Sequence, residues 1–125
     1  MTESQKLQEA YAGAKNYPDL AARLINAGVL SYTVEVSSCI MLYRFANGVI
    51  HLSEKTDAPG AIEAAFSEEL TVKAIRDNQQ GKTTFPQFMQ GMAQAGVRFY
   101  EATLDANPRV TYIGIGGYYT EIIPL

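Results

Sequence analysis

The chain carries one pattern twice, first as YPDLAARLINAGVLSY at residues 17–32 and again as FPQFMQGMAQAGVRFY at residues 85–100. The matching positions are 68 residues apart throughout these two stretches. Further along, Tyr43 and Gly48 match Tyr112 and Gly117 at a separation of 69, so one residue is inserted between them. A repeat of this kind indicates a fold built from two copies of one unit.

Each copy is predicted to be a helix followed by a three-stranded antiparallel meander. In the first copy, Pro18 suits the first helical turn, and Gly28 suits the position after the helix, where a positive φ is often needed. Asn47-Gly48 is typical of a two-residue hairpin turn between strands. The predicted strands are residues 30–36, 39–45 and 49–53 in the first copy and 98–104, 109–115 and 118–123 in the second.

Two further helices are indicated outside the repeat. Thr2 and Gln5 fit a capping box, and a short helix is expected to about residue 14. Residues 61–76 are predicted to form a helix between the copies, with Ser67 as a point where it could break and begin again.

The predicted fold class is α+β: an internal duplication of a helix-plus-three-stranded antiparallel meander unit, joined by a middle helix, with the helices on one face of the sheet. The six strands form either one continuous sheet or two sheets related by a pseudo-twofold. We expect a single domain over residues 1–125, since each half alone is small for a core. Its parts are copy one at about 17–53, a middle helical segment at about 58–79 and copy two at about 85–123.

The turns determine which residues lie opposite each other. A two-residue turn at 37–38 puts Tyr32 opposite Tyr43, and a two-residue turn at 47–48 puts Tyr43 opposite Leu52. One face then carries the apolar residues expected to form the core: Tyr32, Val34, Val36, Cys39, Met41, Tyr43, Phe45, Ile50 and Leu52.

The opposite face carries the polar groups of the first copy. Arg44 lies across from His51 in this register, which suggests a shallow ligand site with His51 as a proton shuttle or binding group. Glu35 shares the face but is about 13 Å from that row at ~3.3 Å per residue, too far for a direct carboxylate–histidine pair. The simpler interpretation is a solvated face with scattered charges. The matching residues of the second copy are Ile113 and Thr120, so such a site would belong to one copy or to the seam between copies.

In the second copy the same pattern pairs Tyr100 with Tyr112, an aromatic pair of the kind that stabilises a sheet by ~0.2–1 kcal/mol. Glu121 on the last strand faces Tyr112 in this register. It could line a pocket there, or pair with Arg98 or Arg109.

Composition excludes several classes of function. The net charge of −3 and the pI of about 5.1 argue against nucleic-acid binding. One His and one Cys form no zinc site, and no glycine-rich nucleotide fingerprint is present, so we expect no metal and no cofactor. No apolar run approaches the ~20 residues of a membrane helix, and the polar start of the chain lacks a signal peptide. We therefore expect a cytoplasmic protein with no membrane partner.

The second copy also carries a series of short motifs: QQGKTTF at 79–85, Phe88, AGV at 95–97, VTY at 110–112, Gly117 and EIIP at 121–124. Together they resemble the YbcV-like family of small bacterial proteins of unknown function, some of them labelled phage envelope protein. The resemblance extends, more loosely, over nearly the whole chain. Members typically carry His before the Gln-Gly pair, where this chain has Asn78, and often Cys where it has Met89. The resemblance implies a prophage origin for some members and brings no established activity or catalytic residue.

These observations favour a non-enzymatic binding or interaction module whose partner the sequence does not identify. A homodimer is expected as one way to protect the edge strands. The alternative is a small-molecule-binding protein or small enzyme that uses Glu35, Arg44 and His51, or Tyr112 with Glu121.

Overall fold

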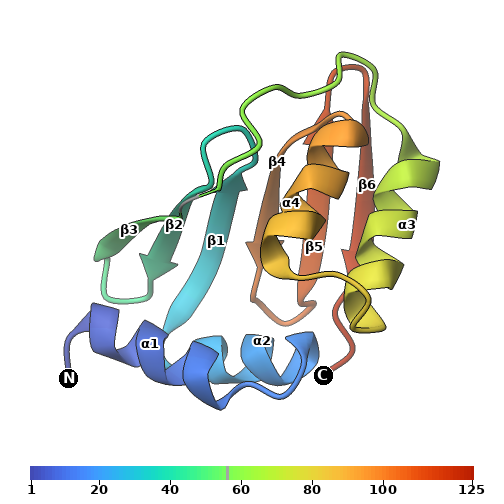
Figure 1. Cartoon of the computed structure of the whole chain (residues 1–125). Coiled ribbons are helices and arrows are strands. Elements are labelled where there is room, and N and C mark those ends of the chain that lie inside the picture. The colour runs from blue at the N-terminus through green and yellow to red at the C-terminus, as the bar shows by residue number, and fades with distance from the viewer. Residues whose placement is uncertain (56) are drawn as a thin grey trace.

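Six antiparallel strands form one continuous sheet in the order β3-β2-β1-β4-β5-β6 (Figure 1). The computed structural model describes residues 1–55 and 57–125. Each copy of the repeat supplies three neighbouring strands, so the predicted α+β duplication is confirmed. The elements are α1 (Glu3–Gly13), α2 (Tyr17–Asn26), β1 (Val29–Glu35), β2 (Ile40–Phe45), β3 (Ile50–Glu54), α3 (Glu68–Gln79), α4 (Phe85–Gln94), β4 (Val97–Thr103), β5 (Arg109–Gly114) and β6 (Gly117–Ile122).

The two copies meet at the β1–β4 pair in the middle of the sheet. Thr33 pairs with Glu101, which is its own counterpart 68 residues later. A pseudo-twofold axis therefore passes between these two residues. The neighbouring pairs follow the same symmetry. Tyr32 lies opposite Ala102, and Tyr100, the counterpart of Tyr32, lies opposite Val34, the counterpart of Ala102.

The repeated helices begin and end as their sequences predict. The side chain of Asn16 accepts a hydrogen bond from the backbone of Asp19 at the start of α2, and Thr84 forms a full capping box at the start of α4. After each helix a glycine adopts a positive φ, +93° at Gly28 and +77° at Gly96. In both copies this turn directs the chain from the helix into the first strand of the meander.

The predicted middle helix is shorter than expected. Helix α3 begins only at Glu68, where the side chain of Ser67 accepts from the third backbone N–H. Residues 61–67 form no helix, so Ser67 begins the helix rather than interrupting one. The segment before it is held against the end of α4, because Glu63 donates its backbone N–H to the carbonyl of Ala93 and Ser67 donates to that of Ala95. These bonds to another element replace the bonds that a helix would make within itself.

The predicted register between β2 and β3 is wrong by one residue. Phe45 donates its backbone N–H to Val49, and Gly48 donates to Phe45, so the loop has three residues rather than two. Gly48 has a φ of +89°, the arrangement of a tight turn followed by a glycine bulge. Tyr43 consequently lies opposite His51, not Leu52.

The helices cover one face of the sheet, and the core lies between them. Figure 1 shows α3 and α4 in front of β4–β6, with α1 and α2 across one end of the sheet. Seven of the nine residues predicted for the core face are buried; Cys39 is one of them, and burial raises the pKa of its thiol. Ile50 and Leu52 are 60% and 61% exposed because the shifted register turns them to the other face.

Candidate functional site

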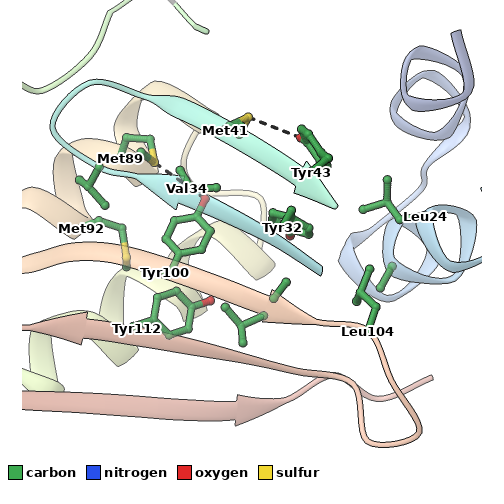
Figure 2. Packing of buried hydrophobic residues seen from close by; sticks show 14 of the residues in the cluster. Leu24, Tyr32, Val34, Met41, Tyr43, Met89, Met92, Tyr100, Leu104 and Tyr112 are labelled. Atoms are coloured by element: carbon green, nitrogen blue, oxygen red, sulfur yellow. Dashed lines mark hydrogen bonds between the residues drawn. The ribbon is translucent and has the colours of Figure 1, made fainter. Parts of the chain in front are cut away.

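One tyrosine or histidine ring from each strand lies on the helix-covered face, and Phe45 adds a second ring on β2. In sheet order this aromatic row consists of His51, Tyr43, Tyr32, Tyr100, Tyr112 and Tyr119. Figure 2 shows its four central tyrosines on neighbouring strands. At the boundary between the copies the row is offset by two residues along the strands, because Tyr32 lies opposite Ala102 and Tyr100 lies opposite Val34.

Ring distances in the row repeat between the two copies. The centroids are 5.4 Å apart for Tyr32 and Tyr43 and 5.3 Å for Tyr100 and Tyr112, which confirms the two predicted pairs. At the outer strands, Tyr43 is 6.4 Å from His51, and Tyr112 is 6.4 Å from Tyr119. The structural counterpart of His51 is therefore Tyr119, not Thr120 as the sequence suggested.

Two hydroxyl pairs connect the row to the N-terminal helices. The hydroxyls of Tyr11 on α1 and Tyr43 are 2.5 Å apart, and the hydroxyl of Tyr17 on α2 forms a hydrogen bond with that of Tyr32. Burial raises the pKa of each of these four tyrosines above the ordinary value of 10.0. The phenols therefore stay neutral at physiological pH.

A cavity of about 320 Å³ opens above the middle of the aromatic row. We call it the tyrosine cavity. Tyr32, Tyr100 and Tyr112 form its floor together with Met41. Its walls come from both pairs of helices: Tyr11, Tyr17 and Leu20 on one side, and Ile75, Phe85 and Phe88 on the other.

Two hydroxyls on the floor have no oxygen partner within the described chain. The hydroxyl of Tyr100 has only a weak contact with the sulfur of Met89, at 4.0 Å, and that of Tyr112 makes no hydrogen bond to a described residue. Burial raises the pKa of both phenols. Each is thus a neutral O–H group available to an acceptor in the cavity.

A second hollow adjoins the tyrosine cavity and is bordered by Tyr112 and Glu121. Glu121 lies opposite Val110 rather than Tyr112, and its partner is Arg76 on α3, at 2.5 Å, rather than Arg98 or Arg109. The hydrogen bond from Arg76 reaches Oε1 of the carboxylate and raises the pKa of the guanidinium. Oε2 is buried and has no partner among the described residues.

The predicted polar site around Arg44 and His51 does not form, because the two side chains lie on opposite faces of the sheet. Arg44 is on the uncovered face, where it donates to Ser31 and Thr33 and pairs with Glu101 at 3.3 Å. His51 is half-buried beside Tyr43 on the helix side. Glu35 is exposed on the uncovered face at the end of β1. Of the five candidate residues, only Tyr112 and Glu121 lie near each other.

Sequence reasoning missed Tyr11, Tyr17, Arg76 and Glu101 as contributors to these contacts. Tyr17 begins the repeat and matches Phe85, so the extra hydroxyl in one copy was a usable signal. Glu101 matches Thr33, and the pair meets only because the two copies join at the pseudo-twofold. Nothing in the local sequence indicates that contact.

Among the described residues, no group of three or more His, Cys, Asp and Glu side chains could hold a metal ion. Within the same part of the chain, no helix has the length and apolar character needed to span a membrane. The helix side of the sheet thus holds a cavity with hydroxyl donors on an aromatic floor.

A comparison with curated proteins gave no match. A comparison with protein families gave a match over residues 5–118, which takes in the first copy, most of the second copy and the residues that line the tyrosine cavity. The chain therefore belongs to the family described as "Protein of unknown function (DUF1398)".

Proposed function

We propose that the protein is a non-enzymatic binding protein that holds a small, flat and mainly apolar molecule in the tyrosine cavity. The observation that carries the proposal is the pair of hydroxyls on Tyr100 and Tyr112, neutral and without an oxygen partner, on the floor of an aromatic cavity. Ligand pockets combine an apolar lining with a few placed polar groups in this way, and about 320 Å³ is at the small end of their range.

The lining also supports a chemical class for the ligand. Lys15, which is exposed at the edge, is the one charged side chain among the described residues that line the cavity. Most of the lining is aromatic or aliphatic, and a charged group would lose much of its hydration on entering, so a molecule with an uncharged body is favoured. An acceptor such as a carbonyl or ether oxygen would receive the hydrogen bonds of the two tyrosines.

The resemblance to YbcV-like proteins adds no ligand to this proposal. A prophage origin, which the resemblance implies for some members, is compatible with a small binding protein. The proposal rests on the cavity.

The test is a thermal-shift screen of the whole chain against a library of small aromatic carbonyl and ether compounds. A ligand of the native state raises the melting temperature by mass action. Each hit is then titrated by calorimetry against Tyr100→Phe and Tyr112→Phe, which remove one hydroxyl and keep the ring. Since a neutral hydrogen bond contributes ~0.5–1.5 kcal/mol, each substitution should weaken binding about two- to tenfold.

Tyr118→Phe is the matched control, because Tyr118 is 68% exposed on the other face of the sheet. It should leave the affinity unchanged. Hits that bind Tyr100→Phe and Tyr112→Phe as tightly as the wild type would contradict the proposed site.

A further inference from the structure

The tyrosine cavity has a polar rim. We use this name for the lining residues that are polar, non-aromatic and exposed: Lys15, Asn16, Asn78 and Gln79. The first two lie in the connection from α1 to α2, and the other two lie at the end of α3. Both pairs of helices that enclose the cavity therefore contribute to the rim.

Two amide side chains of the rim have only N–H groups left to offer. The side-chain oxygen of Asn16 accepts from the backbone N–H of Asp19 at 2.8 Å, and that of Gln79 accepts from the guanidinium of Arg76 at 3.0 Å. These bonds determine which end of each amide is already engaged. Neither NH₂ group donates to a described residue, so each has two donors for a bound molecule.

Asn78 has the opposite arrangement. Its amide nitrogen donates to the carbonyl and the hydroxyl of Thr83, at 3.3 and 3.4 Å, so its oxygen is left as an acceptor. An acceptor group on a ligand would therefore lie toward Asn16 and Gln79. These two residues also line the adjoining hollow, which places them at the boundary between the two spaces.

Lys15 adds a positive charge to these donors. Among the described residues, no side chain forms an ion pair or a hydrogen bond with its ammonium group. Asp19 accepts from the backbone N–H of Lys15 at 3.0 Å, but its carboxylate is paired with Arg23 at 3.1 Å. Glu121 in the adjoining hollow is paired with Arg76. Lys15 is thus a cation at the rim whose neighbouring carboxylates already have partners.

We propose that the ligand of the tyrosine cavity is a small aromatic carboxylate, with its ring on the tyrosine floor and its carboxylate at the polar rim. The inference rests on the proposed function, because it assigns the charged end of the molecule that the cavity binds. The ammonium of Lys15 and the amides of Asn16 and Gln79 donate to the two carboxylate oxygens. A carboxylate accepts through both oxygens and has no donor, so it matches a set of donors.

The position of the rim makes a charged end compatible with an apolar cavity. Since the rim is exposed, the carboxylate keeps part of its hydration while the ring leaves water, and the cost of burying a charge is reduced. Charge-assisted hydrogen bonds are roughly twice as strong as neutral ones, so the rim adds affinity. A ligand with an ammonium end would meet the like charge of Lys15, so the rim also selects against amines.

The test compares probes that differ only at the charged end. The acetylbenzoates and phenoxyacetate each carry a ring, a carbonyl or ether oxygen and a carboxylate, and their primary amides keep the shape without the charge. Each carboxylate and its amide are titrated by calorimetry against the whole chain at low salt. The carboxylates should bind about three- to tenfold more tightly than their amides.

The variants assign that preference to Lys15. Lys15→Met removes the ammonium and should weaken the carboxylate probes about three- to tenfold while their amides bind as before. Lys15→Arg keeps the charge and should keep the preference. Lys6→Met is the matched control, because it makes the same change in net charge, but Lys6 pairs with Glu3 at 3.7 Å and lines a different hollow. It should bind the carboxylates like the wild type.

A preference for the carboxylates that Lys15→Met abolishes and Lys6→Met leaves intact would support the proposal. Amides that bind as tightly as their carboxylates would overturn it, and so would equal losses in Lys15→Met and Lys6→Met. In both cases the proposed function stands if Tyr100→Phe and Tyr112→Phe still weaken binding. Failure of every carboxylate to bind would also overturn the carboxylate assignment, and a thermal-shift screen without hits would overturn the proposed function as well.

Discussion

At the scale of single residues, Gly28 and Gly96 occupy the same position in the two copies but carry different constraints. Both have a positive φ, which an L-residue with a side chain adopts at a cost. A Cβ at Gly28 would meet open space, whereas a Cβ at Gly96 would lie 2.2 Å from the carbonyl oxygen of Ala65. The sequence predicts the positive φ in both copies. The close contact at Gly96 arises only because the segment around Ala65 packs against that turn.

Gly96→Ala should therefore destabilise the protein more than Gly28→Ala. We expect a loss of about 1 kcal/mol for Gly28→Ala, from backbone strain, and about 2–4 kcal/mol for Gly96→Ala, where the clash is added. Urea denaturation of both variants measures the difference. Equal losses would mean that the segment around Ala65 does not pack against this turn.

The buried tyrosines give a second prediction at this scale. Burial raises the folded-state pKa of Tyr32 well above the unfolded value of ~10, so its contribution to stability is complete below that pH and is lost as the pH rises above it. Urea midpoints from about pH 8 to about pH 11 should fall steeply above about pH 10. In Tyr32→Phe the free energy of unfolding should fall with pH less steeply than in the wild type, by up to ~1.4 kcal/mol per pH unit. An unchanged slope in this variant would show that Tyr32 ionises freely in the folded protein.

At the scale of elements, the loop between β2 and β3 decided whether the first-copy site could be predicted. Asn47-Gly48 suits both a two-residue turn and a three-residue loop, because Gly48 accepts a positive φ in either. The side chain of Asn47 accepts from the backbone of Val49, which stabilises the longer loop. One extra loop residue exchanged the two faces of β3 and separated His51 from Arg44.

Arg76 on α3 and Glu121 on β6 form an ion pair between these two elements. Arg76→Met should cost about 1–3 kcal/mol, because it leaves a second carboxylate oxygen of Glu121 without a partner beside the buried Oε2. Glu121→Gln should cost less than about 1 kcal/mol, since the amide oxygen can still accept from Arg76. Urea denaturation compares the two variants.

Lys73→Met is the control for this contact, because Lys73 pairs with Asp77 on the same helix and its side chain is 69% exposed. Exposed pairs contribute ~0–1 kcal/mol, so this variant should be nearly neutral. A loss from Arg76→Met no larger than that from Lys73→Met would contradict the role given to the α3–β6 contact.

At the scale of the whole molecule, the 68-residue repeat predicted the fold class, most element boundaries and the tyrosine pairs within each copy. Those features depend on local pattern, turn residues and alternation along a strand. The tyrosine cavity depends on how the α1–α2 and α3–α4 pairs are spaced over the sheet, and the Arg44–Glu101 pair depends on the junction of the two copies. Contacts between distant segments leave no periodic signal in the chain, so these features could not be predicted.

The central claim is that the tyrosine cavity binds a small molecule, and the most direct measurement is NMR of the protein with its tyrosine rings labelled with carbon-13. On titration with a hit from the thermal-shift screen, the account predicts that the ring signals of Tyr32, Tyr100 and Tyr112 shift while that of Tyr118 stays in place. Shifts at Tyr118 with the three floor tyrosines unchanged would place the ligand on the other face of the sheet and contradict the account.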